Sequence, residues 1–152
     1  MTPEEKLTSM GLVLPSTIVP SANYLPFRWA GNLLFLSGQG PKKVDGTFHI
    51  GRAGRNLTAE QAYEHARLAG LNLLGAAKMA AGELSRISAV VKLFGMVNAE
   101  PDFAAHPQVI NGCSDLFSEV LGEAGRHARS AVGMGSLPNG MSVEVEAVLL
   151  VD

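Results

Sequence analysis

Arg129 is the residue of this sequence whose chemistry most clearly needs a partner. It opens the stretch RSAVGMGSLPNGMSVEVEAVLL, a pattern that predicts two apolar strands joined by a Leu-Pro-Asn-Gly turn. A guanidinium stays charged in proteins, so on a half-buried sheet face it requires a carboxylate or a phosphate. Glu144 or Glu146 on the second strand could supply a carboxylate from within the protein. Otherwise the partner of Arg129 belongs to a ligand.

The other reactive side chains point neither to a metal site nor to a covalent nucleophile. Cys113 is the only cysteine, and it falls on the apolar stripe of a predicted helix, which is typical of a buried, inert thiol. The histidines lack the spacing of metal ligands, and the sequence contains no GxSxG or P-loop motif. We therefore expect no metal and no cofactor.

Composition and charge exclude several classes of partner. Charged residues make up only 17% of the 152 residues, which indicates a surface partly hidden in an oligomer. The formal net charge is −2 and no run of Lys or Arg occurs, so nucleic acid is not an expected partner. The N-terminal segment is too polar for a signal peptide, and no apolar run approaches membrane-spanning length. We expect a soluble, cytoplasmic protein.

The first third of the chain predicts a short helix followed by two strands. Thr2 and the acidic residues after it are typical of a helix start, and Gly11 would end this helix. The apolar segments YLPFRWA and LLFLSG flank Gly31 and Asn32, a pair suited to a two-residue hairpin turn. The glycine-rich stretch that follows indicates a loop with one short strand at residues 48–50.

The remaining sequence alternates two helices with three strands. Thr58 and Gln61 have capping-box spacing at the start of the first long helix, and a second helix begins at about Pro107. Between them, ISAVVKLFGMV is apolar on both alternations, as expected for an interior strand covered on both faces. The order ββ(β)αβαββ predicts a single α+β domain over residues 1–152.

Four segments resemble the RidA (YjgF-like) family, the reactive intermediate deaminases. They are NLLFLSGQGP, DFAAHPQVINGCSDLF, ARSAV and LPNGMSVEVEAV, in the family's order and nearly its spacing. The resemblance covers residues 23–152 and leaves residues 1–22 as an N-terminal extension with a short helix. It implies a YjgF-like, or chorismate-mutase-like, fold: a mixed β-sheet with two helices on one face. It also implies a homotrimer with ligand clefts between subunits.

The resemblance also implies a reaction and a site. The reaction is hydrolysis of 2-enamino or 2-imino acids, such as 2-aminoacrylate, to a 2-keto acid and ammonia. Arg129 matches the arginine that holds the substrate carboxylate, for which a planar fork of donors is well suited. Glu144 matches the acid that activates water, and Gly38 matches a glycine whose backbone approaches the carboxylate. Tyr24 and Asn111 match residues that line the cleft.

Each of these residues also has a structural interpretation. Arg129 could form an ion pair with Glu144 or Glu146, and Glu144 could be a solvated residue on an edge strand. Tyr24 could be a core or interface aromatic residue, and Asn111 could serve helix packing or capping.

The sequence also departs from the family pattern. Ala131 stands where many members of the family have a cysteine, and Arg28 and Trp29 bring bulk and charge near the expected cleft. This chain is therefore identified as a member of a divergent subgroup.

Three functions remain open at this stage. The first is an enamine or imine deaminase, and the second is a non-catalytic trimer that binds small carboxylates or has a regulatory role. The endoribonuclease label carried by some members of the family ranks third, because the chain is slightly acidic and has no basic track. Arg129 would serve either of the first two functions, whereas Glu144 is required only for catalysis.

Overall fold

The structure, a computed structural model, describes all 152 residues and contains one five-stranded sheet. The strand order across the sheet is β1-β2-β5-β3-β4, and only the β3–β4 pair is parallel. The strands are β1 (Phe27–Ala30), β2 (Leu33–Gln39), β3 (Ile87–Asn98), β4 (Ala128–Met134) and β5 (Val143–Val151). The sheet is therefore mixed, and the fold is α+β.

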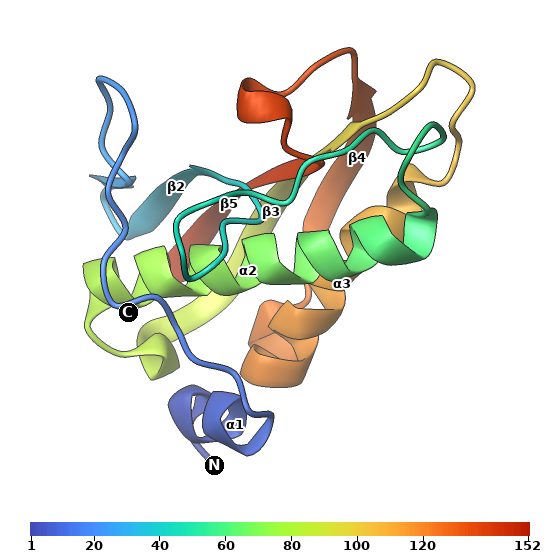
Figure 1. Cartoon of the computed structure of the whole chain (residues 1–152). Helices are drawn as coiled ribbons and strands as arrows, with labels where there is room; N and C mark the ends of the chain where they lie inside the picture. The colour runs from blue at the N-terminus through green and yellow to red at the C-terminus, as the bar shows by residue number, and fades with distance from the viewer.

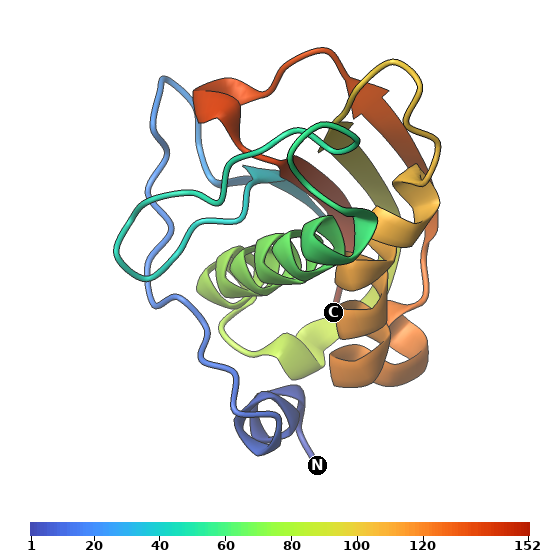
Figure 2. The same ribbon diagram turned by 45° about the vertical axis from the view of Figure 1, so that its right-hand side comes forward.

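Two long helices cover one face of this sheet, as Figures 1 and 2 show. The helices are α1 (Pro3–Ser9), α2 (Ala59–Ala81) and α3 (His106–Leu121), and short 3-10 turns lie at Leu84–Arg86, Gly122–Gly125 and Pro138–Gly140. Helices α2 and α3 pack on the sheet and on each other, while α1 lies at one end of the molecule, as both views show. None of the helices combines the length and apolar character needed to cross a bilayer.

The local signals in the sequence account for the element boundaries. The side-chain hydroxyl of Thr58 accepts a hydrogen bond from the backbone N–H of Gln61, and the backbone N–H of Thr58 donates to the side-chain oxygen of Gln61. The predicted capping box is therefore confirmed. Thr2 caps α1 in the same way. Gly31 has a φ of 59° in the two-residue turn between β1 and β2, a conformation that glycine adopts without strain.

Two expectations about strands need correction. Residues 48–50 form no strand, because their backbone groups pair only in isolated bridges, Lys42 with Phe48 and Ile50 with Met141. Strand β3 does lie inside the sheet, but the prediction that both its faces are covered is wrong within one chain. The helices bury Leu93 and Val97, whereas Phe94 on the other face stays partly exposed.

The buried face and the open face of the sheet differ in chemistry. Val143, Val145, Ala147 and Leu149 of β5 alternate toward the helices and are almost fully buried. On the open face, Phe35 is 44% exposed, and no helix of the chain lies over it. The strands therefore carry more apolar side chains than the helices of one chain cover.

Candidate functional site

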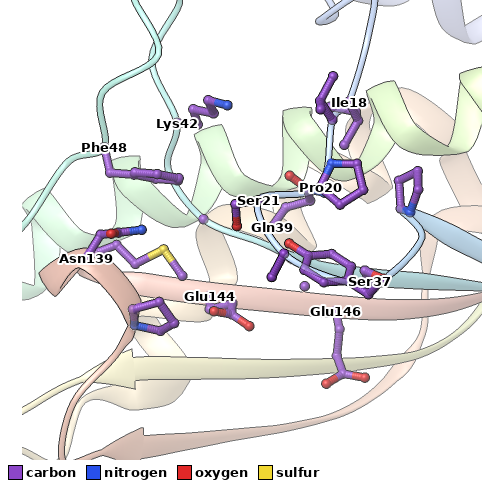
Figure 3. A pocket seen from close by; sticks show the side chains of 18 residues that line it. Ile18, Pro20, Ser21, Ser37, Gln39, Lys42, Phe48, Asn139, Glu144 and Glu146 are labelled. Carbon is purple, nitrogen blue, oxygen red and sulfur yellow. The ribbon is translucent and has the colours of Figure 1, made fainter.

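A cavity of about 520 Å³ brings together three of the five residues expected at the site, Tyr24, Gly38 and Glu144. Its walls come from segments that are distant in the sequence. They are the N-terminal segment around Pro20, the end of β2, the loop that carries Lys42 and Phe48, and the start of β5. Figure 3 shows Glu144 and Glu146 along one side of this cavity, with Ile18 and Lys42 opposite them.

Glu144 is a half-buried carboxylate without a partner in the chain. It lies on β5, the middle strand of the sheet, opposite Met96 of β3. The interpretation as an edge-strand residue is therefore wrong. The carboxylate of Glu144 accepts no hydrogen bond and forms no ion pair with any group of this chain. Burial, and secondarily the neighbouring carboxylate of Glu146, raise the pKa of Glu144 above its ordinary 4.5.

Gly38 occupies a position where a side chain would displace that carboxylate. The β2–β5 register shifts between Leu36 and Gln39, so Gly38 lies in the irregular part of this strand pair. A Cβ atom added at Gly38 would collide with Oε2 of Glu144. The glycine therefore lets the carboxylate lie directly against the β2 backbone at the cavity wall.

Tyr24 stands at the entrance to the cavity and is not a core residue of the chain. Its side chain is 45% exposed, and it lines both this cavity and a smaller neighbouring hollow that includes Arg28 and Phe35. Arg28 is exposed on β1, in register with Phe35. The expectation that Arg28 brings charge near the cleft agrees with this placement.

Arg129 and Asn111 lie elsewhere, at the opposite edge of the sheet. Arg129 is on the edge strand β4, where its guanidinium donates to Oγ of Ser114 (2.9 Å) and to the carbonyl oxygen of Pro107 (3.1 Å). Asn111 is half-buried on α3, four residues after Pro107 and three before Ser114, so it shares their helix face. Arg129 and Asn111 line none of the three main cavities.

The proposed ion pair between Arg129 and Glu144 or Glu146 is absent, because the two strands present these side chains on opposite faces. Arg129 and Ala147 both pair with Leu93, so Arg129 lies in the row that faces the helices. Glu144 and Glu146 point to the open face, since they alternate with the buried residues of β5. The guanidinium has neutral oxygen partners and no carboxylate.

Part of the space expected beside Arg129, that at Gly133, is occupied within the chain. Ala131 and Gly133 share its strand face, as the alternation predicts. However, a Cβ atom at Gly133 would lie 2.7 Å from Nε2 of His106, because the start of α3 packs against this part of the strand. Cys113 on the same helix is fully buried, and burial raises the pKa of its thiol, in agreement with an inert role.

Sequence reasoning missed several cavity residues that come from loops. Lys42, Phe48, Asn139 and Met141 all line the cavity, together with residues 18–22. Irregular segments carry no periodic signal, so only the glycine and proline content of these regions marked them as loops. No group of three or more His, Cys, Asp or Glu side chains is arranged to hold a metal ion.

Comparison with known proteins places this fold in a family. The profile described as YjgF/chorismate-mutase-like, candidate endoribonuclease, matches residues 4–145. A Trypanosoma cruzi protein named TCP17 is 40% identical over 94% of this chain and 90% of its own length. The crystal structure of a candidate endoribonuclease from Shewanella oneidensis is 36% identical, with a TM-score of 0.95 over 99% of this chain and all of that one.

A more distant structure carries the name that the sequence motifs indicated. RidA from an Antarctic Psychrobacter species superposes with a TM-score of 0.60 at 22% identity, covering 90% of this chain and 94% of that one, a likeness of fold. The family match spans nearly the whole domain, and it agrees with the motifs around Gly38, Asn111, Arg129 and Glu144. This chain belongs to the YjgF-like RidA family.

Proposed function

We propose that this protein hydrolyses reactive 2-imino and 2-enamino acids, such as 2-aminoacrylate, to 2-keto acids and ammonia. The observation that carries the proposal is Glu144, an unpaired, half-buried carboxylate beside a cavity, whose pKa is raised above its ordinary value by burial. A general base works best when its pKa lies near the working pH. No cofactor takes part in this chemistry.

The reaction consumes one water molecule and moves protons between water, Glu144 and the substrate. Protonation of 2-aminoacrylate at C3 gives the iminium form of its imine tautomer. Glu144 takes a proton from water as the oxygen adds to the iminium carbon, which yields a neutral carbinolamine. Glu144 then gives that proton to the nitrogen, and the C–N bond breaks to release ammonia as the hydroxyl proton passes back to Glu144 and the ketone of the 2-keto acid forms. The raised pKa of Glu144 suits both its base and its acid role.

Arg129 is proposed to hold the substrate carboxylate from a second subunit. Its guanidinium has only the neutral partners Ser114 and Pro107, so its charge is not compensated in the chain. In this proposal the β4 edge of one subunit, with Arg129 and Asn111, faces the Tyr24, Gly38 and Glu144 cavity of its neighbour. Such a head-to-tail contact closes into a ring if the rotation between subunits allows it.

The open face of the sheet supports a homotrimeric ring. Phe35 is in register with Val148 on β5, and Val132 of β4 adds another apolar side chain that is 37% exposed. An uncovered sheet face with apolar side chains is typical of a surface that packs on another subunit. Light scattering at micromolar concentration should give the mass of a trimer, whereas a monomer mass would contradict the inter-subunit site.

The activity can be tested with 2-aminoacrylate made in place by a pyridoxal-phosphate dehydratase acting on serine. The protein should accelerate the formation of pyruvate above the spontaneous rate. Boiled protein and the Glu144→Gln variant serve as controls for trace catalysis. If wild-type protein binds simple carboxylates but no imino acid disappears faster than in buffer, the deaminase proposal fails and a binding protein takes its place.

A further inference from the structure

A second cavity, of about 560 Å³, adjoins the one that contains Glu144. The two cavities share four lining residues, Ile18, Val19, Gln39 and Lys42. Figure 3 shows Ile18, Gln39 and Lys42 at the first cavity, across from Glu144 and Glu146. Because these residues border both cavities, a ligand bound at Glu144 could extend past them into the second cavity.

The second cavity lies between α2, the loop after β2 and residues 13–22, which we call the strap. Its walls are rich in aliphatic side chains. They are Val13, Leu14, Ile18 and Val19 of the strap, Leu68 and Leu71 of α2, and Val44 of the loop. Leu71 is 9% exposed, so this wall is continuous with the hydrophobic core. The chemistry of the cavity therefore favours a hydrocarbon chain.

The strap is attached to the domain by packing alone along most of its length. Residues 13–21 neither donate nor accept a hydrogen bond. Pro15 sits on Gly75 of α2 so closely that a Cβ atom at Gly75 would collide with the proline ring. Leu14 and Ile18 pack against the core. A segment anchored by side chains and free of backbone hydrogen bonds can shift at small cost when a ligand enters.

Resting on the proposed function, we infer that the second cavity is a side-chain subsite for 2-imino acids with an extended apolar side chain. The reacting carbon lies at Glu144, and the side chain runs past Ile18 and Val19 into the space between the strap and α2. The preferred substrates are then imino acids with several side-chain carbons, and the three-carbon 2-iminopropionate leaves the subsite empty.

The charged residues at this cavity do not favour an acidic side chain. Lys42 and Lys43 are exposed and lie beside Asp45, which carries the opposite charge. Thr47 donates two hydrogen bonds to Asp45, and they keep the pKa of this carboxyl low. All three charged side chains are exposed, so solvent screens their attraction for an acidic substrate, whereas Leu71 of the aliphatic wall is buried. We therefore assign the subsite to hydrocarbon.

The experiment compares 2-iminopropionate, 2-iminohexanoate and 2-iminoglutarate, each produced by an amino-acid oxidase and followed by semicarbazide trapping. A buried methylene raises kcat/KM by roughly fourfold, so 2-iminohexanoate should exceed 2-iminopropionate by at least about tenfold. The acidic 2-iminoglutarate should show no such gain. A larger gain for 2-iminoglutarate would overturn the assignment in favour of recognition by the lysines.

Filling the subsite provides the matched test. Leu68→Trp, on α2, fills only the second cavity. It should abolish most of the preference for the long substrate while kcat/KM for 2-iminopropionate stays within about threefold. Val13→Trp, on the strap, also lies outside the first cavity and should act in the same direction. Met79→Trp is the control, because Met79 lies on the same helix as Leu68, is 40% exposed and lines neither cavity. An unchanged preference in folded Leu68→Trp protein would contradict the subsite.

Calorimetry with stable 2-keto acids separates failure of the subsite from failure of the deaminase. If no imino acid is hydrolysed, 2-oxohexanoate should still bind at least about tenfold more tightly than pyruvate, and Leu68→Trp should remove the difference. That result keeps the subsite and rejects the deaminase. If imino acids are hydrolysed with no preference for length, the deaminase stands and the subsite is wrong.

Discussion

The two parts of the proposed site differ in what each of them lacks. The part around Glu144 has a cavity and an unpaired carboxylate whose pKa is raised, but no arginine points into it. The part around Arg129 has a guanidinium held by two neutral oxygens, but no carboxylate and none of the main cavities. The two parts have complementary charges and lie on opposite faces of one sheet, so the site that we propose would form only between two chains.

Replacing Glu144, the proposed base, should cause the largest loss of activity. Glu144→Gln keeps the shape of the side chain, removes the base and should lower kcat by about 10²–10⁴-fold. Glu64→Gln is the control, since Glu64 is an exposed carboxylate on α2 that lines none of the main cavities, and it should have an effect of less than about threefold. In wild type, the rate should fall in acid through a pKa above 4.5. Equal losses in the two variants would remove Glu144 from its proposed role.

The same variant should separate catalysis from folding stability. Burial raises the pKa of Glu144 in the folded protein, so the folded state holds a proton that the unfolded state releases. The resulting stabilisation is present below the unfolded pKa and is lost as pH rises through the folded pKa. Glu144→Gln should therefore be at least as stable as wild type in urea near neutral pH. Marked destabilisation there would indicate a structural role for Glu144.

Removing the cation at the second part should cause the next largest loss. A charge-assisted contact to a carboxylate contributes roughly 2–4 kcal/mol, so Arg129→Ala should lower kcat/KM by about 30- to 1000-fold. Ala131→Cys, on the same strand face two residues later, serves as the control and should change kcat/KM by less than about twofold. Full activity of Arg129→Ala as a trimer would show that the substrate carboxylate is bound elsewhere.

The smallest effect concerns the loop that supplies Lys42 and Phe48 to the first part. His49 of this loop stacks on His65 of α2 with ring centroids 4.3 Å apart, and Nδ1 of His65 lies 2.8 Å from Oγ of Ser142. Burial, and secondarily the charge of His49, lower the pKa of His65 to about 4. Neutral His65 therefore stabilises the fold above about pH 6.5, and this stability is lost as pH falls toward 4.

Urea unfolding at several pH values tests this dependence. Between about pH 7 and pH 4 the free energy of unfolding should fall by about 1–2 kcal/mol more in wild type than in His65→Gln, which cannot titrate, because partial exposure of His65 reduces the full effect of its pKa shift. The hydrogen bond between Tyr63 of α2 and Asp115 of α3 provides a reference, because it involves no histidine. In Tyr63→Phe, the free energy of unfolding should therefore change with pH as it does in wild type. Identical slopes for His65→Gln and wild type would remove His65 as the source of acid sensitivity.

The sequence predicted the regular elements well because their signals are local. The capping box at Thr58 and Gln61 and the turn at Gly31 depend on residues only a few positions apart in the sequence, and both are confirmed. The separation of Arg129 from Glu144 agrees with the cleft between subunits that the family resemblance implies. No local sequence pattern indicates it, because it depends on the register that puts the two side chains on opposite faces of the sheet. The strap and the loop at Lys42 have no periodic pattern, so their contribution to the cavity also required the structure.

Mixing two inactive variants tests the shared site most directly. If Glu144 and Arg129 act from different subunits, Arg129→Ala and Glu144→Gln protein, unfolded together and refolded as mixed trimers, should recover activity. In random assembly about one site in four receives a native Glu144 from one chain and a native Arg129 from its neighbour, which predicts about a quarter of wild-type kcat. No recovery from trimers shown to contain both chains would mean that the two residues do not form one site across the interface.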